Sequence, residues 1–266
     1  MKTIYERPSE ALQDADLSFC GGCGHGIVHK LLAEVLQEHG LVDDTIILWP
    51  IGCSMTGSLY LNTDNINALH GKAPAMATGV KRAVPESLVI TYQGDGDLIA
   101  EGIAEIFSAT ARGEDISVIF INNANYGMTG GQQAPTTMVG QVTSTTPYGR
   151  SAETNGYPIN AAEMLAMMPG CIYSERVTVT NPANVAKVKK AIEKALLNQW
   201  EGKHGLSFVE VLSPCPTNWK MAPLEALQFI DDVMTKQYPL GVFKDMDAPD
   251  AVQAFPPINV QEEVAK

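Results

Sequence analysis

The chain has 266 residues, of which 45% are hydrophobic and 18% are charged, enough for one large α/β domain with a substantial core. Its net charge of −12 argues against nucleic acid and anionic membranes as partners, because both are bound through basic patches. No apolar run approaches the roughly 20 residues of a transmembrane helix, and the acidic first residues lack the apolar core of a signal peptide. We therefore expect a cytoplasmic protein, whose five cysteines are more typical of metal or redox ligands than of a disulfide framework.

The first chemical motif follows a polar segment, residues 1–18, which predicts an extended arm or a peripheral helix. Cys20 and Cys23 enclose two glycines, a spacing that can direct two thiolates at one metal centre. The pair alone is compatible with zinc, an iron–sulfur cluster or a redox dithiol. A thioredoxin-type dithiol should follow a strand, and no strand is predicted before Cys20, so the redox dithiol is the weakest of the three. Apolar residues at helical spacing over residues 26–39 then predict an amphipathic helix that ends at Gly40.

A second cysteine and a histidine lie in the next loops. Residues 45–48 predict a buried strand that ends shortly before Cys53. His70 lies beside a glycine in a loop that precedes a short helix at 75–82. A histidine there could orient a diphosphate or a substrate carboxylate, but a single histidine is more often structural, and Lys72 is equally well a solvated surface charge.

The central stretch of the chain, residues 88–132, predicts a strand at 88–92, a glycine turn, a helix at 98–112, a second strand at 117–121 and another turn. A strand–helix–strand unit of this length forms a parallel pair, so both strands end at the same edge of the sheet. Asp95 and Asn123 are thereby placed side by side at the carboxyl ends of neighbouring strands, where open α/β sheets bind ligands.

The residue types at this edge suit a diphosphate bound through Mg²⁺. A carboxylate, an amide oxygen and a backbone carbonyl are ligands that Mg²⁺ combines with substrate phosphates. Gly94 and Gly96 lack a Cβ, so the backbone can approach a diphosphate closely. Gly-Asp-Gly by itself is better explained as a plain turn that uses these residues for backbone reasons, but Asn122-Asn123 at the end of the next strand favours the cation site.

The remaining segments alternate between helix and strand. Residues 134–158 show no periodicity and predict a covering loop or a subunit contact. Further elements are expected at 159–168 (helix), 172–179 (strand), 182–199 (helix begun by Asn181 and Pro182), 208–212 (strand) and 223–234 (helix). Residues 238–266 are rich in proline and predict a tail that wraps around a neighbour.

Cys215 follows the strand at 208–212, so it also lies at a strand end. Cys20, Cys23, Cys53 and Cys215 all lie in turns flanked by glycine or proline, where side chains can converge. Cys171 begins an apolar run and is interpreted as a buried structural thiol. Four buried structural cysteines remain the alternative to a shared metal centre.

Two motifs carry a resemblance to a known family. Gly94-Asp95-Gly96, followed fewer than thirty residues later by Asn122-Asn123, resembles the fingerprint of thiamine diphosphate-dependent enzymes. The segment 126–132 resembles, more specifically, the β subunit of the 2-oxoacid:ferredoxin oxidoreductases. This resemblance covers about residues 17–245. Segments 23–26, 92–97, 146–150 and 215–219 are most similar to the 2-oxoisovalerate type. The implied fold is a single α/β thiamine diphosphate-binding domain over 1–266, with a mostly parallel sheet and helices on both faces.

The resemblance implies site residues, position by position. Mg²⁺ would be bound by the side chains of Asp95 and Asn123 and by the carbonyl of Asn125. A [4Fe–4S] cluster would be held by the four turn cysteines; Gly21 departs from the proline of many relatives without affecting ligation. His70 would be catalytic. The cofactor would lie against Ile51, Gly52, Cys53, Ser54, Gly94, Gly96, Asp97, Gly127, Met128 and Thr129.

The implied activity is coenzyme A-dependent oxidative decarboxylation of a 2-oxoacid, with electrons passed to ferredoxin. The glutamate that activates thiamine would come from an α subunit with its own pyrimidine-binding domain, and γ and ferredoxin-like δ subunits are expected. 2-Oxoisovalerate is the favoured substrate, with 2-oxoglutarate, pyruvate and aryl pyruvates left open. Rival interpretations are a non-catalytic electron-transfer subunit, which would not need Asp95 and Asn123, and a non-oxidative thiamine decarboxylase, which would not need the four cysteines.

Overall fold

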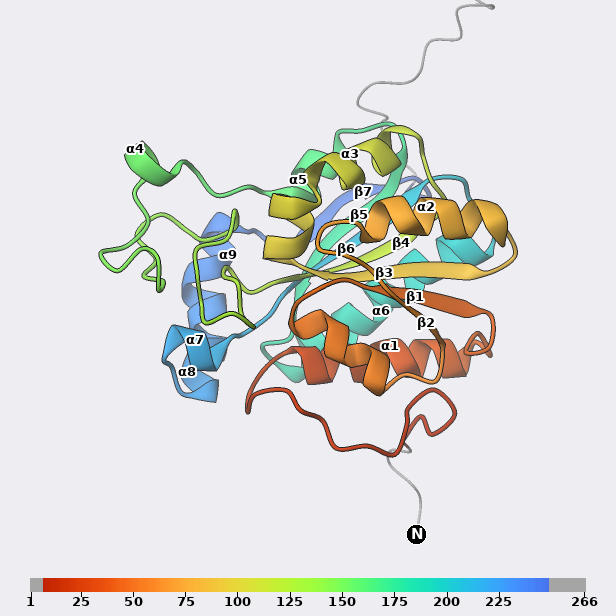
Figure 1. Ribbon diagram of the computed structural model, residues 1–266, viewed down its shortest axis with the longest axis horizontal. Coiled ribbons are helices and arrows are strands. Elements are labelled where there is room, and N and C mark those ends of the chain that lie inside the picture. The colour runs from red at the N-terminus through yellow and green to blue at the C-terminus, as the bar shows by residue number, and fades with distance from the viewer. Residues whose placement is uncertain (1–6, 249–266) are drawn as a thin grey trace, which may run out of the picture.

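A seven-stranded sheet forms the centre of the computed structural model, which describes residues 7–248 (Figure 1). The strand order is β2-β1-β3-β4-β6-β5-β7, and every neighbouring pair is parallel except β5 and β7. The strands are β1 Thr45–Trp49, β2 Asp64–Asn67, β3 Leu88–Gly94, β4 Ser117–Asn122, β5 Cys171–Thr178, β6 Leu206–Leu212 and β7 Gly241–Asp245. The predicted α/β class with a mostly parallel sheet is therefore confirmed.

Helices cover both faces of the sheet, and the strands alternate their side chains between the two. In β4, Ile119 and Ile121 belong to the core beneath α1 and α6, whereas Val118 and Phe120 belong to the core beneath α2, α3 and α5. The main helices are α1 His25–Glu38, α2 Ala73–Ala83, α3 Ile103–Ala111, α5 Ala161–Ala166, α6 Pro182–Trp200 and α8 Pro223–Phe229. Short helices are α4 Ala152–Asn155, α7 Pro216–Trp219 and α9 Thr235–Gln237.

Helix boundaries follow the local signals in the sequence. The Asn181 side chain accepts a hydrogen bond from the Asn184 N–H at 3.0 Å, and Pro182 occupies the first turn of α6, as predicted. Gly40 follows α1 with φ +65°, a conformation that suits glycine, so the predicted end of this helix is also confirmed. None of the helices in the described part of the chain is long and apolar enough to cross a membrane.

Several sequence predictions were wrong. Strand β2 was not predicted, and residues 241–245, assigned to the tail, form β7 against β5. The remainder of that predicted tail, beyond residue 248, lies outside the described residues, as do residues 1–6 of the predicted arm. The expected helix at 98–112 begins instead with a π-helical turn, Asp97–Glu101, and the region 53–59 after β1 is a 3₁₀ helix. Strand β2 is largely exposed and β7 is mostly half-buried, and neither shows the apolar alternation that identifies strands in a sequence.

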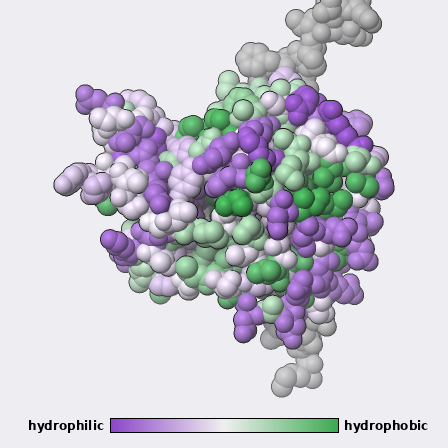
Figure 2. Space-filling model, in the orientation of Figure 1, coloured by the Kyte–Doolittle hydropathy of each residue, from purple (hydrophilic) through white to green (hydrophobic). Residues whose placement is uncertain are grey.

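A lobe formed by residues 139–158 projects from the body of the molecule and includes α4 (Figure 1). Its visible surface is mostly hydrophilic to neutral (Figure 2). Arg150 is 5% exposed and holds the base of the lobe through its guanidinium group. This group donates hydrogen bonds to the carbonyl oxygens of Ala134, Pro135, Thr137, Asn155, Gly156 and Tyr157. The segment predicted as an irregular loop is thus an ordered structure fixed through its main chain.

Candidate active site

Four adjacent strands deliver the candidate residues to one edge of the sheet. β1, β3, β4 and β6 lie next to one another in that order. Their carboxyl ends are followed by Cys53, Asp95, Asn123 and Cys215, one residue for each strand. The order along the sheet explains how residues more than 160 positions apart in sequence come to one place, as the strand-end argument predicted.

One small cavity at this edge, of about 60 Å³, collects all the residues that the sequence assigned to the diphosphate and Mg²⁺. Its lining is His25, Ile51, Gly52, Cys53, Ser54, His70, Gly94, Asp95, Gly96, Asp97, Asn123, Asn125, Tyr126, Gly127, Met128 and Thr129. The glycines give this cavity its shape, since a Cβ on Gly96 would lie 2.3 Å from the ring of Tyr126.

Asp95 is the only carboxylate among the three predicted Mg²⁺ ligands, and it is 2% exposed. Its Oδ1 accepts a hydrogen bond from the Gly96 N–H at 2.9 Å, and its Oδ2 accepts one from the Thr136 hydroxyl at 2.5 Å. Burial raises the pKa of Asp95 to about 7, against the opposing effect of these hydrogen bonds. A cation bound here would stabilise the ionised form of this buried carboxylate, so Asp95 is suited to act as a metal ligand.

The turn after β4 presents amide oxygens next to Asp95. Ala124 takes φ +55°, and its N–H donates to Asn122 Oδ1 at 3.1 Å, which closes a tight turn. Asn125 is 2% exposed, and its Oδ1 is buried without a hydrogen-bond partner among the described residues. A buried oxygen left unpaired costs free energy unless a ligand satisfies it, so this turn fits an oxygen-binding cation.

His70 approaches the same cavity from the loop before α2. Its Nδ1 lies 2.6 Å from Asp97 Oδ1. Asp97 is itself held by the Gln93 side-chain amide at 2.6 Å and by the Gly71 N–H at 2.7 Å. Burial raises the pKa of Asp97, while these donors and His70 lower it. Lys72, in contrast, pairs with Glu105 and does not line the cavity.

A second cavity, of about 300 Å³, is lined by all four turn cysteines, Cys20, Cys23, Cys53 and Cys215. A Cβ placed on Gly127 would lie 3.5 Å from Cys53 Sγ and 3.7 Å from Cys215 Sγ, so these two sulfurs converge on one glycine. Burial, together with the neighbouring thiols, raises the pKa of Cys23 to about 12 and that of Cys53 to about 11. Cys171 is fully buried elsewhere, with its thiol directed at the Tyr173 carbonyl at 3.3 Å.

Within residues 7–248, no group of three or more His, Cys, Asp or Glu side chains is close enough together to hold a single metal ion. The predicted Mg²⁺ ligand set contains only one carboxylate. The thiolates of a four-iron cluster each bind a different iron atom, so they surround a volume and not a point. Thiols arranged around a cavity of about 300 Å³ therefore suit a cluster better than one zinc ion.

Three residues near the site were not assigned a role from the sequence. The Tyr126 hydroxyl donates a hydrogen bond to Glu101 at 3.1 Å, and its ring packs over Gly96. Its place in the motif at 126–132 was the sequence feature that could have pointed to it. Thr136 binds Asp95 from the segment predicted as a loop, with no local signal. His25 lines both cavities, and its place two residues after Cys23 was the only indication.

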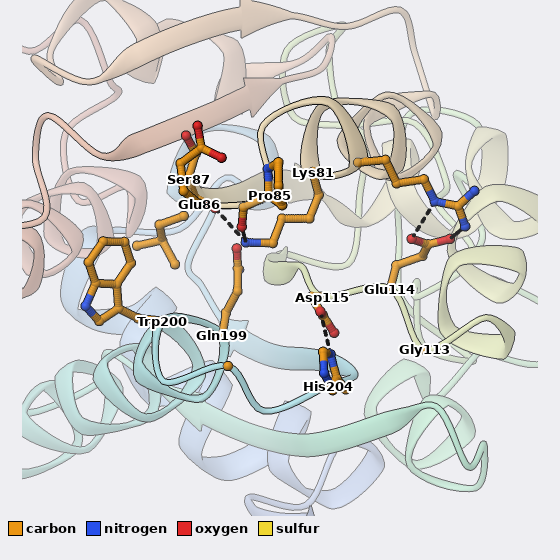
Figure 3. A pocket seen from close by; sticks show the side chains of 13 residues that line it. Lys81, Pro85, Glu86, Ser87, Gly113, Glu114, Asp115, Gln199, Trp200 and His204 are labelled. Carbon is orange, nitrogen blue, oxygen red and sulfur yellow. Dashed lines mark hydrogen bonds and ion pairs between the residues drawn. The ribbon is translucent and has the colours of Figure 1, made fainter.

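A larger hollow, of about 650 Å³, lies at the opposite, amino edge of the sheet (Figure 3). Four of its charged side chains, Lys81, Arg82, Glu114 and Asp115, already have partners among the described residues. Lys81 donates to the carbonyls of Pro85 and Ser87 at 2.8 and 2.7 Å, and Asp115 lies 2.9 Å from His204. None of the side chains described there is a buried polar group lacking a partner, so this hollow is a weaker candidate than the carboxyl edge.

Comparisons with known proteins agree with this geometry. Residues 50–211 match the family model described as the thiamine pyrophosphate enzyme, C-terminal TPP-binding domain. The ketoisovalerate oxidoreductase subunit VorA of Methanothermobacter thermautotrophicus is 42% identical over 245 residues, covering 92% of this chain and 51% of that protein. The chain thus spans about half the length of the VorA relatives that it matches.

Another relative is matched over nearly its whole length. The 2-oxoglutarate synthase subunit KorB of Methanocaldococcus jannaschii is 33% identical over 256 residues, covering 88% of this chain and 90% of that protein. A solved 2-oxoglutarate:ferredoxin oxidoreductase from Magnetococcus marinus has the same fold, with a TM-score of 0.74, 22% identity, and coverage of 99% of this chain and 92% of that one. The chain therefore belongs to the 2-oxoacid:ferredoxin oxidoreductase family, as a member of its thiamine pyrophosphate-binding subunits.

Proposed function

We propose that this chain is the subunit of a 2-oxoacid:ferredoxin oxidoreductase that binds both thiamine diphosphate with Mg²⁺ and a [4Fe–4S] cluster. The observation that carries the proposal is the contact between the two cavities. They share His25, Cys53, Asn123, Gly127 and Met128 in their linings, so the groups bound in them would be neighbours. A thiamine enzyme without electron transfer has no need of the cysteine cavity, and a simple electron carrier has no need of the diphosphate cavity.

For the diphosphate, the chain would provide an anchor through Mg²⁺. Asp95 and Asn123 would bind the cation through their side chains and Asn125 through its carbonyl. The backbone at Gly94 and Gly96 is free to contact phosphate oxygens, because no Cβ stands in the way. When bound, thiamine diphosphate would supply the carbanion stabilisation that decarboxylation needs.

His70 is the proposed catalytic side chain of this subunit. Its Nδ1 faces the buried carboxylate of Asp97, an arrangement that orients the imidazole and leaves Nε2 as the nitrogen available to substrate. His70 itself is 36% exposed, so it can reach a molecule entering from outside the chain. Its role would be to orient the substrate carboxylate or to move a proton there.

The site would be completed by another polypeptide. None of the described residues that line the diphosphate cavity is a glutamate, whereas thiamine activation needs one against the aminopyrimidine ring. This region is bordered by exposed apolar side chains, as expected of a surface that a partner covers. Ile51 and Met128, in the lining, are 39% and 48% exposed, and Leu69, beside His70, is 75% exposed. We assign the missing glutamate to an α subunit, with γ and ferredoxin-like δ subunits, ferredoxin and coenzyme A as further partners.

The proposed substrate is 2-oxoisovalerate, with 2-oxoglutarate as the second candidate. The first rests on the 42% identity with the ketoisovalerate oxidoreductase subunit, the second on the match to a 2-oxoglutarate synthase subunit over most of its length. The two substrates differ by the second carboxylate of 2-oxoglutarate, which a pocket must pair with a cationic or hydrogen-bonding group, so measured kcat/KM values on the assembled enzyme separate them.

The decisive experiment measures iron and thiamine diphosphate separately in anaerobically purified complex. Single serine substitutions of Cys20, Cys23, Cys53 and Cys215 should each lower the iron content, and Cys171→Ser is the matched control that should not. Asp95→Ala should abolish thiamine diphosphate binding while iron stays complete. Equal iron loss at all five cysteines, stoichiometric zinc, or full thiamine occupancy without the Asp95 carboxylate would contradict the proposal.

A further inference from the structure

One polar side chain borders both cavities without a role so far. His25 begins α1, is 3% exposed, and lines both the diphosphate cavity and the cysteine cavity. Its main-chain N–H donates to the Cys23 thiol, which places the residue directly behind that sulfur. Its ring stacks on Phe19, with centroids 5.3 Å apart and an interplanar angle of 16°, so the plane of the imidazole is fixed.

The tautomer of His25 follows from its single side-chain hydrogen bond. Nδ1 lies 3.0 Å from the hydroxyl of Tyr92, a fully buried residue of β3. Within the described chain, the Tyr92 hydroxyl has no other hydrogen-bond partner, so its proton must go to Nδ1 for the buried donor to be satisfied. The imidazole proton then lies on Nε2, the nitrogen on the opposite side of the ring, which has no partner among the described residues.

We propose that His25 donates a hydrogen bond from Nε2–H to a sulfur atom of the iron–sulfur group held by the four cysteines, and that Tyr92 acts as a positioning residue by fixing this tautomer. The inference rests on the proposed function, since it concerns the group that the cysteines bind. The cysteine cavity is favoured over the diphosphate cavity because Phe19, which holds the ring, lines only the former, and because Cys23 already accepts the His25 N–H.

A donor at this position would set the reduction potential of the cluster. Hydrogen bonds to the sulfurs stabilise the reduced state, which carries one more negative charge, and so raise the potential. The effect would act on the electron acceptor next to the thiamine site and not on ligation of the iron. Potential and iron content can therefore be separated by experiment.

The test uses the complex of this chain with its partner, purified anaerobically, and compares wild type with His25→Leu and Tyr92→Phe. Iron and sulfide content are measured first, and then the midpoint potential by a redox titration followed by electron paramagnetic resonance. We expect full iron content in both variants, a more negative potential in His25→Leu, and a smaller shift of the same sign in Tyr92→Phe. His29→Leu is the matched control, because His29 is 1% exposed in the same aromatic cluster but lines neither cavity.

The possible outcomes are distinguishable. Wild-type potentials in both variants with full iron would overturn the inference and leave the proposed function standing. An unchanged potential with weakened thiamine diphosphate binding would also overturn it, because the donor would then face the other cavity. An equal shift in His29→Leu would show a packing effect. Tyr92→Phe removes only one oxygen atom, so the test remains valid even if His25→Leu does not fold. Absence of iron in the wild-type complex would refute the proposed function itself.

Discussion

Replacing Thr136 by valine should weaken Mg²⁺ and thiamine diphosphate binding without unfolding the protein. Thr136 is fully buried, and its hydroxyl donates to Asp95 Oδ2 at 2.5 Å, while valine fills nearly the same volume without the donor. A hydrogen bond to a charged group contributes about 1.5–3 kcal/mol, which corresponds to about a ten- to hundredfold change in an equilibrium constant. Loss of a group that orients a metal ligand typically has an effect of the same size on metal affinity.

The assay starts from the complex of this chain with its partner, from which Mg²⁺ and thiamine diphosphate have been removed. Both are then titrated back and their binding is measured by calorimetry. Thr136→Ser keeps the hydroxyl and should retain most of the affinity. Thr110→Val is the control for removing a buried hydroxyl, because Thr110 is equally buried but bonds only to the Ile106 carbonyl in its own helix. Wild-type affinity in Thr136→Val, or equal weakening in the serine variant, would refute the reasoning.

Three further predictions concern the site, the core and the partner. Gly96→Ala should lower the free energy of unfolding by about 1–3 kcal/mol in urea titrations and impair thiamine diphosphate binding, because its Cβ meets the Tyr126 ring at 2.3 Å; Gly94→Ala, with nothing within 4 Å, should leave unfolding unchanged. Arg176→Met should lower the free energy of unfolding by about 3–5 kcal/mol, because it removes the guanidinium group that lies 3.0 Å from the fully buried Glu210 carboxylate. Adding Glu210→Gln should recover part of this loss. Wild-type stability in the single variant would count against this account. The isolated chain, loaded with thiamine diphosphate, Mg²⁺ and its cluster, should not decarboxylate any 2-oxoacid in a viologen-reduction assay until the α partner is added, and turnover by the chain alone would overturn the subunit assignment.

The central part of the fold could be predicted from the sequence because its signals are local. The strands that end before Asp95 and Asn123 are short, fully buried apolar runs joined by one helix, and parallel pairing of such units is nearly obligatory. Their carboxyl ends therefore had to meet. The same reasoning placed Cys53 and Cys215 at strand ends, although it did not give the order of the strands.

Other features depend on contacts that no local pattern records. Strands β2 and β7 lie at the two edges of the sheet; β2 exposes most of its residues and β7 is mostly half-buried, so neither has the composition of a core strand. Thr136 reaches Asp95 across 41 positions, and His25 reaches Tyr92 across 67. In each case the two partners lie on different elements, and only the packed structure shows that they meet.

The way in which Arg150 holds the projecting lobe has a consequence for sequence variation. All of its acceptors are main-chain carbonyl oxygens, which every amino acid possesses. Much of the path of the lobe therefore does not depend on its side chains. The exceptions are Gln141, Thr143 and Thr146, whose side chains form hydrogen bonds there, and glycines such as Gly149, where a Cβ would meet the Gly140 carbonyl at 2.7 Å. Fully exposed positions such as Tyr148 can change without altering that path. A protein with this arrangement can diversify the surface of the lobe while the Thr136 side of the cofactor site stays in place.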